Sequence, residues 1–236
     1  MEKILCWSGG KDSTALLIRQ VEACTPPHRI LFADVGPEAE FDETYEFIEK
    51  VERTLNVQVE RIKSTRYTFD SYFYSPISRG PRKGMLRGFP PTASVGCSYR
   101  RELKVIPLCA AQGKGNEIYL GIAADEKHRA ERSFYKTADN TYHFPLIEDG
   151  ITEDMCLQIC QKYDLVHPLY AYFKRLGCWQ CPKQSLSSLR ALYQNWPEKW
   201  QKLEPYQRDC AWDFQPNRSV FDLSERFRKE FHNEDR

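Results

Sequence analysis

The feature that most constrains this chain is a glycine turn between two apolar runs near its start. Residues 4–7 are Ile-Leu-Cys-Trp and residues 15–18 are Ala-Leu-Leu-Ile. Between them stands the hexapeptide Ser8, Gly9, Gly10, Lys11, Asp12, Ser13. This order predicts a strand, a tight turn and the start of a helix. Because the first amides of a helix have no intrahelical partner, such a turn favours binding of an anion such as a phosphate group.

Strand-like and helix-like segments continue to alternate after this turn. Residues 29–35, 57–62 and 118–122 predict strands, and residues 41–55 carry apolar side chains at helical spacing. Strands separated by helices indicate an α/β fold, with a parallel sheet and helices on both of its faces. Ligands of such sheets bind beyond the carboxyl ends of the strands, so we expect residues 8–13, Asp34 and residues 123–125 on one edge.

The second part of the chain is expected to be mostly helical, with helices over residues 152–163, 185–195 and 197–203. We therefore predict a nucleotide-binding α/β domain over residues 1–150 and a helical region over residues 151–236. Trp196, Trp200 and Trp212 are interpreted as helix-packing residues. Residues 75–94, rich in Gly, Pro and Arg, predict a long loop that is either a lid or anion-contacting segment or a solvated surface loop.

Composition narrows the classes of protein. The 34 basic residues nearly balance the 33 acidic ones, so the whole chain lacks the charge typical of nucleic-acid binding. No apolar run is long enough for a membrane span, and the first residues do not resemble a signal peptide, so we expect a cytoplasmic protein without a membrane partner. Nine cysteines in that reducing compartment favour metal, cluster or catalytic thiols over a disulfide framework.

Eight of the nine cysteines fall into two groups, and Cys210 stands apart from both. Cys178 and Cys181 form a C-x-x-C pair, and Cys97 precedes it by 81 residues. A single pair fits half of a zinc site, part of an iron–sulfur site, a redox pair or two structural cysteines. The cysteines expected on apolar faces, as core residues, are Cys6, Cys24, Cys109, Cys156 and Cys160.

Residues 8–13 do not match the Walker phosphate loop; they resemble the PP-loop of the ATP pyrophosphatase superfamily. Cys97, the run Lys-Val-Ile-Pro-Leu at residues 104–108, and the later C-x-x-C pair resemble the phosphoadenylyl sulfate (PAPS) reductase family of that adenine nucleotide alpha hydrolase-like superfamily. Residues 34–44 and 121–130 are similar to two further stretches of the family. The chain departs from the family at residues 96–97, which are Gly-Cys where cluster-bearing members have Cys-Cys.

The resemblance implies a set of site residues. It assigns an adenine nucleotide, ATP or another, with Mg²⁺, to Ser8, Gly9, Gly10, Lys11, Asp12, Ser13, Asp34 and Gly121. It implies catalytic roles for Lys11, Asp12 and Arg129. The cations expected near the phosphates are Lys11, Arg100, Arg101, Lys104, Lys127, Arg129 and Arg132.

The same resemblance implies a metal centre at Cys97, Cys178 and Cys181. Three thiolates on a 4Fe–4S cluster leave one iron open to a further ligand. Zinc is the alternative, with His128 or His167 as candidates for a fourth ligand.

Three functions remain open from the sequence. The leading one is ATP-dependent adenylation followed by sulfur transfer on a three-cysteine iron–sulfur cluster. The second is reduction of PAPS or adenylyl sulfate to sulfite, for which Cys210 would supply the thiol in place of the family's C-terminal E-C-G-L/I-H cysteine. The third is a non-catalytic nucleotide-binding module. The expected partners are a nucleic-acid acceptor (tRNA or DNA) or a sulfonucleotide, a sulfur donor or reductant protein, and a second copy of the chain.

Overall fold

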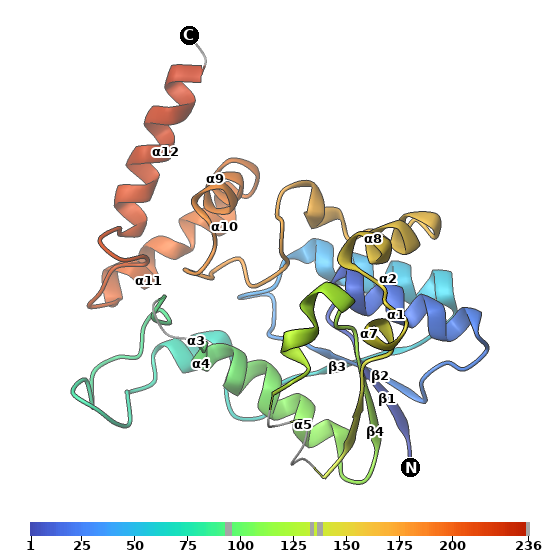
Figure 1. The fold of residues 1–236 in the computed structure, drawn as a ribbon. Coiled ribbons are helices and arrows are strands. Elements are labelled where there is room, and N and C mark those ends of the chain that lie inside the picture. The colour runs from blue at the N-terminus through green and yellow to red at the C-terminus, as the bar shows by residue number, and fades with distance from the viewer. Residues whose placement is uncertain (93–95, 133–134, 136–138, 235–236) are drawn as a thin grey trace.

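The structure is a computed structural model, and it describes residues 1–92, 96–132, 135 and 139–234 (Figure 1). Its centre is a five-stranded sheet in the order β3-β2-β1-β4-β5, in which every neighbouring pair is parallel. The strands are β1 (Lys3–Cys6), β2 (Arg29–Ala33), β3 (Val59–Ile62), β4 (Glu117–Leu120) and β5 (Thr141–His143). The predicted α/β class with a parallel sheet is therefore confirmed.

Helices cover both faces of the sheet, because side chains alternate along each strand. Leu5 and Trp7 pack in one cluster with α1 (Lys11–Glu22) and α2 (Asp42–Leu55). Ile4 and Cys6 belong to a separate, smaller cluster with residues of α5 (Ile106–Gln112). Figure 1 shows α5 on the side of the sheet opposite α1 and α2.

Most of the remaining helices are short, and α12 is the long exception. Before β4 the chain forms α3 (Phe69–Phe73), α4 (Ser98–Arg100) and the π-helical turn η1 (Arg101–Val105). After β4 come the 3₁₀ turn η2 (Ala124–Arg129), α7 (Pro145–Glu148), α8 (Glu153–Lys162) and the 3₁₀ turn η3 (Pro168–Ala171). The chain then ends in α9 (Leu186–Asn195), α10 (Pro197–Gln201), α11 (Leu203–Asp209) and α12 (Val220–Glu234), which lie away from the sheet in Figure 1.

Both large hydrophobic clusters contain residues from before and after residue 150. In the cluster beside α1, Leu16 and Phe47 pack with Cys156 and Leu165. In the second, aromatic residues of the first half, such as Phe41, pack with the helices α9 to α12. The division at residue 150 stays a prediction, and the two segments share their cores.

Several local expectations differ from the structure. The strand β5 was not predicted, because Thr141–His143 is only three residues long and carries no apolar pattern. The expected strands over 57–62 and 118–122 are Val59–Ile62 and Glu117–Leu120. Cys24 is not a core residue. It follows the end of α1 with a φ of 55° and is exposed, because the chain turns outward there.

Residues 75–92 form a loop, as predicted, closed by one antiparallel bridge between Pro76 and Leu86. Residues 93–94 of the expected loop lie outside the described residues. Trp196 and Trp200 are buried in the helical cluster, as expected of packing residues. None of the helices in the described chain combines the length and the apolar character that crossing a bilayer requires.

Candidate functional site

The hexapeptide forms a tight turn between β1 and α1. Gly9 has a φ of +75°, a conformation that residues with a side chain rarely adopt, and Gly10 is the N-cap of α1. Ser13 closes the turn, since its hydroxyl donates to the Gly10 carbonyl at 3.0 Å and accepts the Ser8 amide at 3.1 Å. The Lys11 amide donates to the hydroxyl of Tyr170 at 3.1 Å. The turn is therefore held by side chains rather than by further backbone pairing.

Gly121 lets the end of β4 approach this turn. A Cβ at position 121 would lie 2.6 Å from both the Cα and the amide nitrogen of Ser13. Backbone atoms at that distance cannot yield by a side-chain rotation. A glycine is thus required at position 121, because the backbone packs closely against the start of α1 there. Gly121 also lines the cavity above the turn.

A cavity of about 570 Å³ opens above the turn. Of the residues expected at the nucleotide site, it is lined by Ser8, Gly10, Lys11, Asp12, Ser13, Gly121 and Arg129. Further residues that line it are Lys104, Arg132, Lys174, Arg175, His128, His167, Tyr170, Glu40 and Glu126. The amino end of α1, six lysine and arginine side chains and this volume together suit an anionic ligand of the size of a nucleotide.

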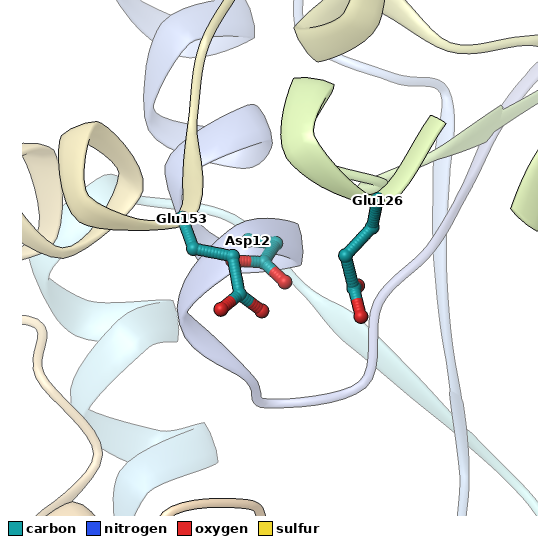
Figure 2. Close-up of side chains that lie close together, drawn as sticks. All are labelled: Asp12, Glu126 and Glu153. Carbon is teal, nitrogen blue, oxygen red and sulfur yellow. The ribbon is translucent and has the colours of Figure 1, made fainter. Parts of the chain in front are cut away.

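Three carboxylates meet at the edge of this cavity. Asp12, Glu126 and Glu153 each place one oxygen so that the three lie within 4.8 Å of one another. Figure 2 shows Asp12 at the start of α1, with Glu153 approaching from α8 and Glu126 from the opposite side of the turn. Oδ1 of Asp12 is buried, and its polar neighbour is the Lys11 ammonium at 3.3 Å. Oxygen ligands converging beside a phosphate site fit Mg²⁺, which binds through few carboxylates plus phosphate oxygens.

Cations compensate these carboxylates. The Lys11 ammonium lies 3.0 Å from Glu153 and 3.3 Å from Asp12. Burial raises the pKa of Asp12; Lys11 opposes this, and the two other carboxylates add to it. Burial lowers the pKa of Lys11, but Glu153 and Asp12 outweigh it, so the net pKa is raised and Lys11 stays charged. Glu126 pairs with Arg129 and, at 3.9 Å, with Arg175.

His167 lies beneath the turn and is 2% exposed. Its Nδ1 accepts the Leu169 amide at 3.2 Å, which places the proton on Nε2, and Nε2 is buried without a partner. Burial lowers the pKa of His167 to about 4, so the ring is neutral at physiological pH. Together with Tyr170 it forms a wall of the nucleotide cavity.

Some expected site residues lie elsewhere. Asp34 is buried, accepts from the Gly36 amide and the Tyr45 hydroxyl, and borders a separate hollow of about 110 Å³. Gly9 shapes the turn without lining the cavity. Among the expected phosphate cations, Lys11, Lys104, Arg129 and Arg132 line the cavity, whereas Arg100, Arg101 and Lys127 do not.

The expected thiol cluster lies next to this cavity. Cys97, Cys178 and Cys181 are close enough for each to influence the ionisation of another. Burial raises the pKa of Cys178 to about 12, and Lys104 opposes this rise. Lys104 also pairs with Glu40 at 3.5 Å, and both line the nucleotide cavity. Lys104 therefore lies between the phosphate region and the thiols.

A second cavity, of about 390 Å³, is lined in part by Cys181. It shares residues 174–177 with the nucleotide cavity, so this short segment separates the two spaces. Within the described chain, the three sulfurs do not all lie within 4.8 Å of one another. A zinc ion with bonds of about 2.3 Å would hold its thiolates roughly 3.8 Å apart. His128 and His167, the expected fourth zinc ligands, line the nucleotide cavity instead.

Cys210 is 8% exposed and lies against Gly88, within the loop over residues 75–92. A Cβ on Gly88 would come within 2.3 Å of its sulfur and 3.0 Å of the Trp212 ring. Cys210 lines neither of the two cavities. Its position is that of a packed core thiol.

Sequence reasoning missed several residues of this site. Glu153 was recognised only as part of a helix start, because an acidic residue in a first helical turn is common without any site. Glu126 lies in a stretch that is similar to the family, but the sequence analysis assigned it no role. Tyr170, Lys174 and Arg175 come from the segment after α8, which carries no motif for phosphate binding.

Comparisons with known proteins agree with this geometry. The family model described as "Phosphoadenosine phosphosulfate reductase domain" matches residues 2–75. The uncharacterized protein MJ0066 of Methanocaldococcus jannaschii is 23% identical over 221 residues, which are 88% of this chain and 42% of that protein. The chain thus spans about two fifths of the length of that curated relative.

Two solved structures are similar. The PAPS reductase of Candida auris, in a phosphate complex, superposes with a TM-score of 0.50 and 14% identity, covering 76% of this chain and 82% of that one. The U34-tRNA thiolase NcsA of Methanococcus maripaludis, with its 4Fe–4S cluster, gives a TM-score of 0.45 and 13% identity, covering 97% of this chain and 72% of that one.

The parallel sheet, the turn at residues 8–13 and the cavity above it define a PP-loop α/β protein. Residues 2–75 match the model of the phosphoadenosine phosphosulfate reductase domain, the family that the motifs of the chain resemble. The similarity to the reductase from Candida auris is a similarity of fold.

Proposed function

We propose that this chain binds Mg²⁺–ATP at residues 8–13, adenylates an acceptor and replaces the activated oxygen by sulfur. The observation that carries the proposal is the triad of Asp12, Glu126 and Glu153 beside a phosphate-binding turn. Three carboxylates repel a bare polyphosphate, so the site suits a nucleotide that arrives with a divalent cation. Mg²⁺ held there would neutralise charge on the phosphates and on the leaving pyrophosphate.

The protein's own groups suit the first step. An acceptor oxygen attacks the α-phosphorus; that O–P bond forms, the bond to the bridging oxygen breaks, and pyrophosphate leaves with its electrons. The amides of the turn and Lys11 would bind the oxygens on which charge develops. Arg129 would exchange its pairing with Glu126 for a phosphate oxygen, since arginine pairs well with phosphate.

The second step needs a sulfur donor of the hydrosulfide class. Its sulfur attacks the carbon that bears the adenylated oxygen; a C–S bond forms, the C–O bond breaks, and AMP departs. Cys97, Cys178 and Cys181 would hold a 4Fe–4S cluster, whose fourth iron offers a place for such a sulfur. Three cysteines suit a cluster with one open iron, and the histidines expected as fourth zinc ligands line the neighbouring cavity instead.

Nucleotide binding tests the proposal directly. We expect ATP to bind about tenfold or more tightly with Mg²⁺ than without it, measured by titration calorimetry. Asp12→Asn and Glu153→Gln should abolish that enhancement. Glu198→Gln, at an exposed residue of α10 outside both cavities, is the matched control. Tight, Mg²⁺-independent binding of PAPS with release of sulfite would establish the reductase instead.

The thiol centre has its own test. Protein purified without oxygen should contain about four iron and four sulfide per chain, and Cys178→Ser should lose them. Cys24→Ser, at an exposed cysteine, should keep them. A well-folded wild-type protein that contains no iron or sulfide would contradict the proposed cluster. The proposal of nucleotide binding would then be decided by the binding experiment alone.

A further inference from the structure

A groove outside the nucleotide cavity borders one of the cysteines. It measures about 540 Å³ and is lined by Ile77, Arg79, Pro81, Arg82, Arg87, Phe89, Pro90, Pro91, Gly96, Ser98 and Trp212. We call it the arginine groove. Figure 1 shows the segment over residues 75–92 projecting from α3, away from the sheet. Gly96 and Ser98 flank Cys97, so the groove ends at the thiol cluster.

The charge of this region is strongly one-sided. The sequence contains no Asp or Glu between Asp70 and Glu102, but six basic residues, namely Arg79, Arg82, Lys83, Arg87, Arg100 and Arg101. The whole chain has a net charge of only +1. Among the described residues that line the arginine groove, none is acidic. A local basic surface on a nearly neutral protein is typical of binding to a polyanion.

The arginines differ in how they are engaged. Arg87 is held by the Ser75 hydroxyl and the Pro76 carbonyl and lies over the Tyr72 ring, so it is a structural residue. Arg79 lines the groove, and Lys83 lies in the same loop just outside its lining. The side chains of both make no ion pair or hydrogen bond with the described residues, and both are exposed. Their charges are free for a ligand.

The groove also offers a flat aromatic surface. The Trp212 indole donates to the Phe89 carbonyl at 3.1 Å, which fixes the ring, and Arg82 lies 4.8 Å above its centre. A second hollow, of about 260 Å³, shares Arg82, Pro90, Pro91 and Trp212 and continues past Asp213 to Asn217. The two hollows together suit an elongated ligand better than a single small anion.

We propose that the arginine groove binds an unpaired strand of nucleic acid and leads it past Cys97. Free guanidinium and ammonium groups would contact the phosphates, and the Arg82–Trp212 stack would receive a base, as aromatic and arginine planes do in single-strand sites. The inference that this strand is the sulfur acceptor rests on the proposed sulfur transfer. The inference that the groove binds nucleic acid does not depend on that reaction.

Binding of a fluorescein-labelled, unstructured 20-nucleotide RNA, followed by anisotropy on the full chain, tests the groove without ATP or a metal centre. We expect the double variant Arg79→Glu/Lys83→Glu to bind about tenfold or more weakly. Its slope of log K against log salt should fall by about 1.4, from about 0.7 for each lost phosphate contact. A DNA strand of the same sequence shows whether the sugar matters.

The matched control is Arg53→Glu/Lys114→Glu, an equal charge change at exposed residues near the amino ends of the strands. It should keep the affinity and slope of the wild type. Equal weakening by both double variants would overturn the proposal, as would wild-type affinity in the groove variant. Strong RNA binding with no sulfur transfer would contradict the proposed reaction while leaving the groove intact.

Discussion

Gly121 shows how a single missing side chain sets the geometry of the phosphate turn. In Gly121→Ala, the Cβ would lie 2.6 Å from Ser13 backbone atoms, so the start of α1 must shift. We expect a loss of roughly 1–3 kcal/mol in the free energy of unfolding, as for other overpacked sites, and nucleotide binding weakened by about tenfold or more. Gly177→Ala, where no atom lies within 4 Å, should leave the free energy of unfolding unchanged. Urea unfolding of the two variants checks this.

Also at the residue scale, His167 makes stability depend on pH. Its folded pKa, about 4, is below the ordinary value of 6.5, so the unfolded chain takes up a proton first as the pH falls. The contribution is complete above pH 6.5 and is lost progressively toward pH 4. Between pH 7 and pH 5 the wild type should lose about 2 kcal/mol that His167→Gln does not lose. Parallel urea titrations at both pH values measure the difference; identical losses would contradict the assignment.

At the scale of elements, α8 brings Glu153 to the turn at residues 8–13. The Cys160 thiol donates to the Lys11 carbonyl at 3.3 Å, and the Glu153 amide donates to Asp125 of η2. Thr152 caps the helix through the Met155 amide. Thr152→Ala should lower the free energy of unfolding by about 1 kcal/mol and weaken the Mg²⁺ dependence of nucleotide binding. Thr54→Ala, at an exposed position of α2, should change neither quantity; equal effects of the two variants would contradict the role of the cap.

At the scale of the whole molecule, the shared cores predict one cooperative unfolding transition. Leu16 and Leu165 pack in one cluster although they lie far apart in the chain, and Phe41 and Trp196 pack in the other. Because unfolding of residues 151–236 would expose the apolar face of α1, neither segment should melt alone. Far-UV circular dichroism and tryptophan fluorescence should give coincident urea curves. Two separate transitions would instead support the domain boundary at residue 150.

The sequence by itself determined the parallel α/β class and the glycine turn at residues 8–13. Alternating apolar segments and two glycines before a helix are local signals that the backbone obeys within a few residues. The same holds for α2 and α8, whose observed bounds differ from the predicted ones by one residue at the ends. The prediction that Cys24 is a core residue was wrong, because its exposure depends on where the chain leaves α1. A pattern of single residues does not encode that point.

Only the tertiary structure decided which side chains meet. Glu126, Glu153 and Asp12 are far apart in the chain, and each alone resembles an ordinary surface carboxylate. Lys104 reaches both the nucleotide cavity and Cys178 because η1 lies between them, and Asp34 is satisfied by Tyr45 and Gly36 away from that cavity. Periodicity fixes which face of an element is buried, whereas contacts between distant elements depend on how those faces pack. The turn at residues 8–13 was therefore predictable from the sequence, and the side chains that meet it were not.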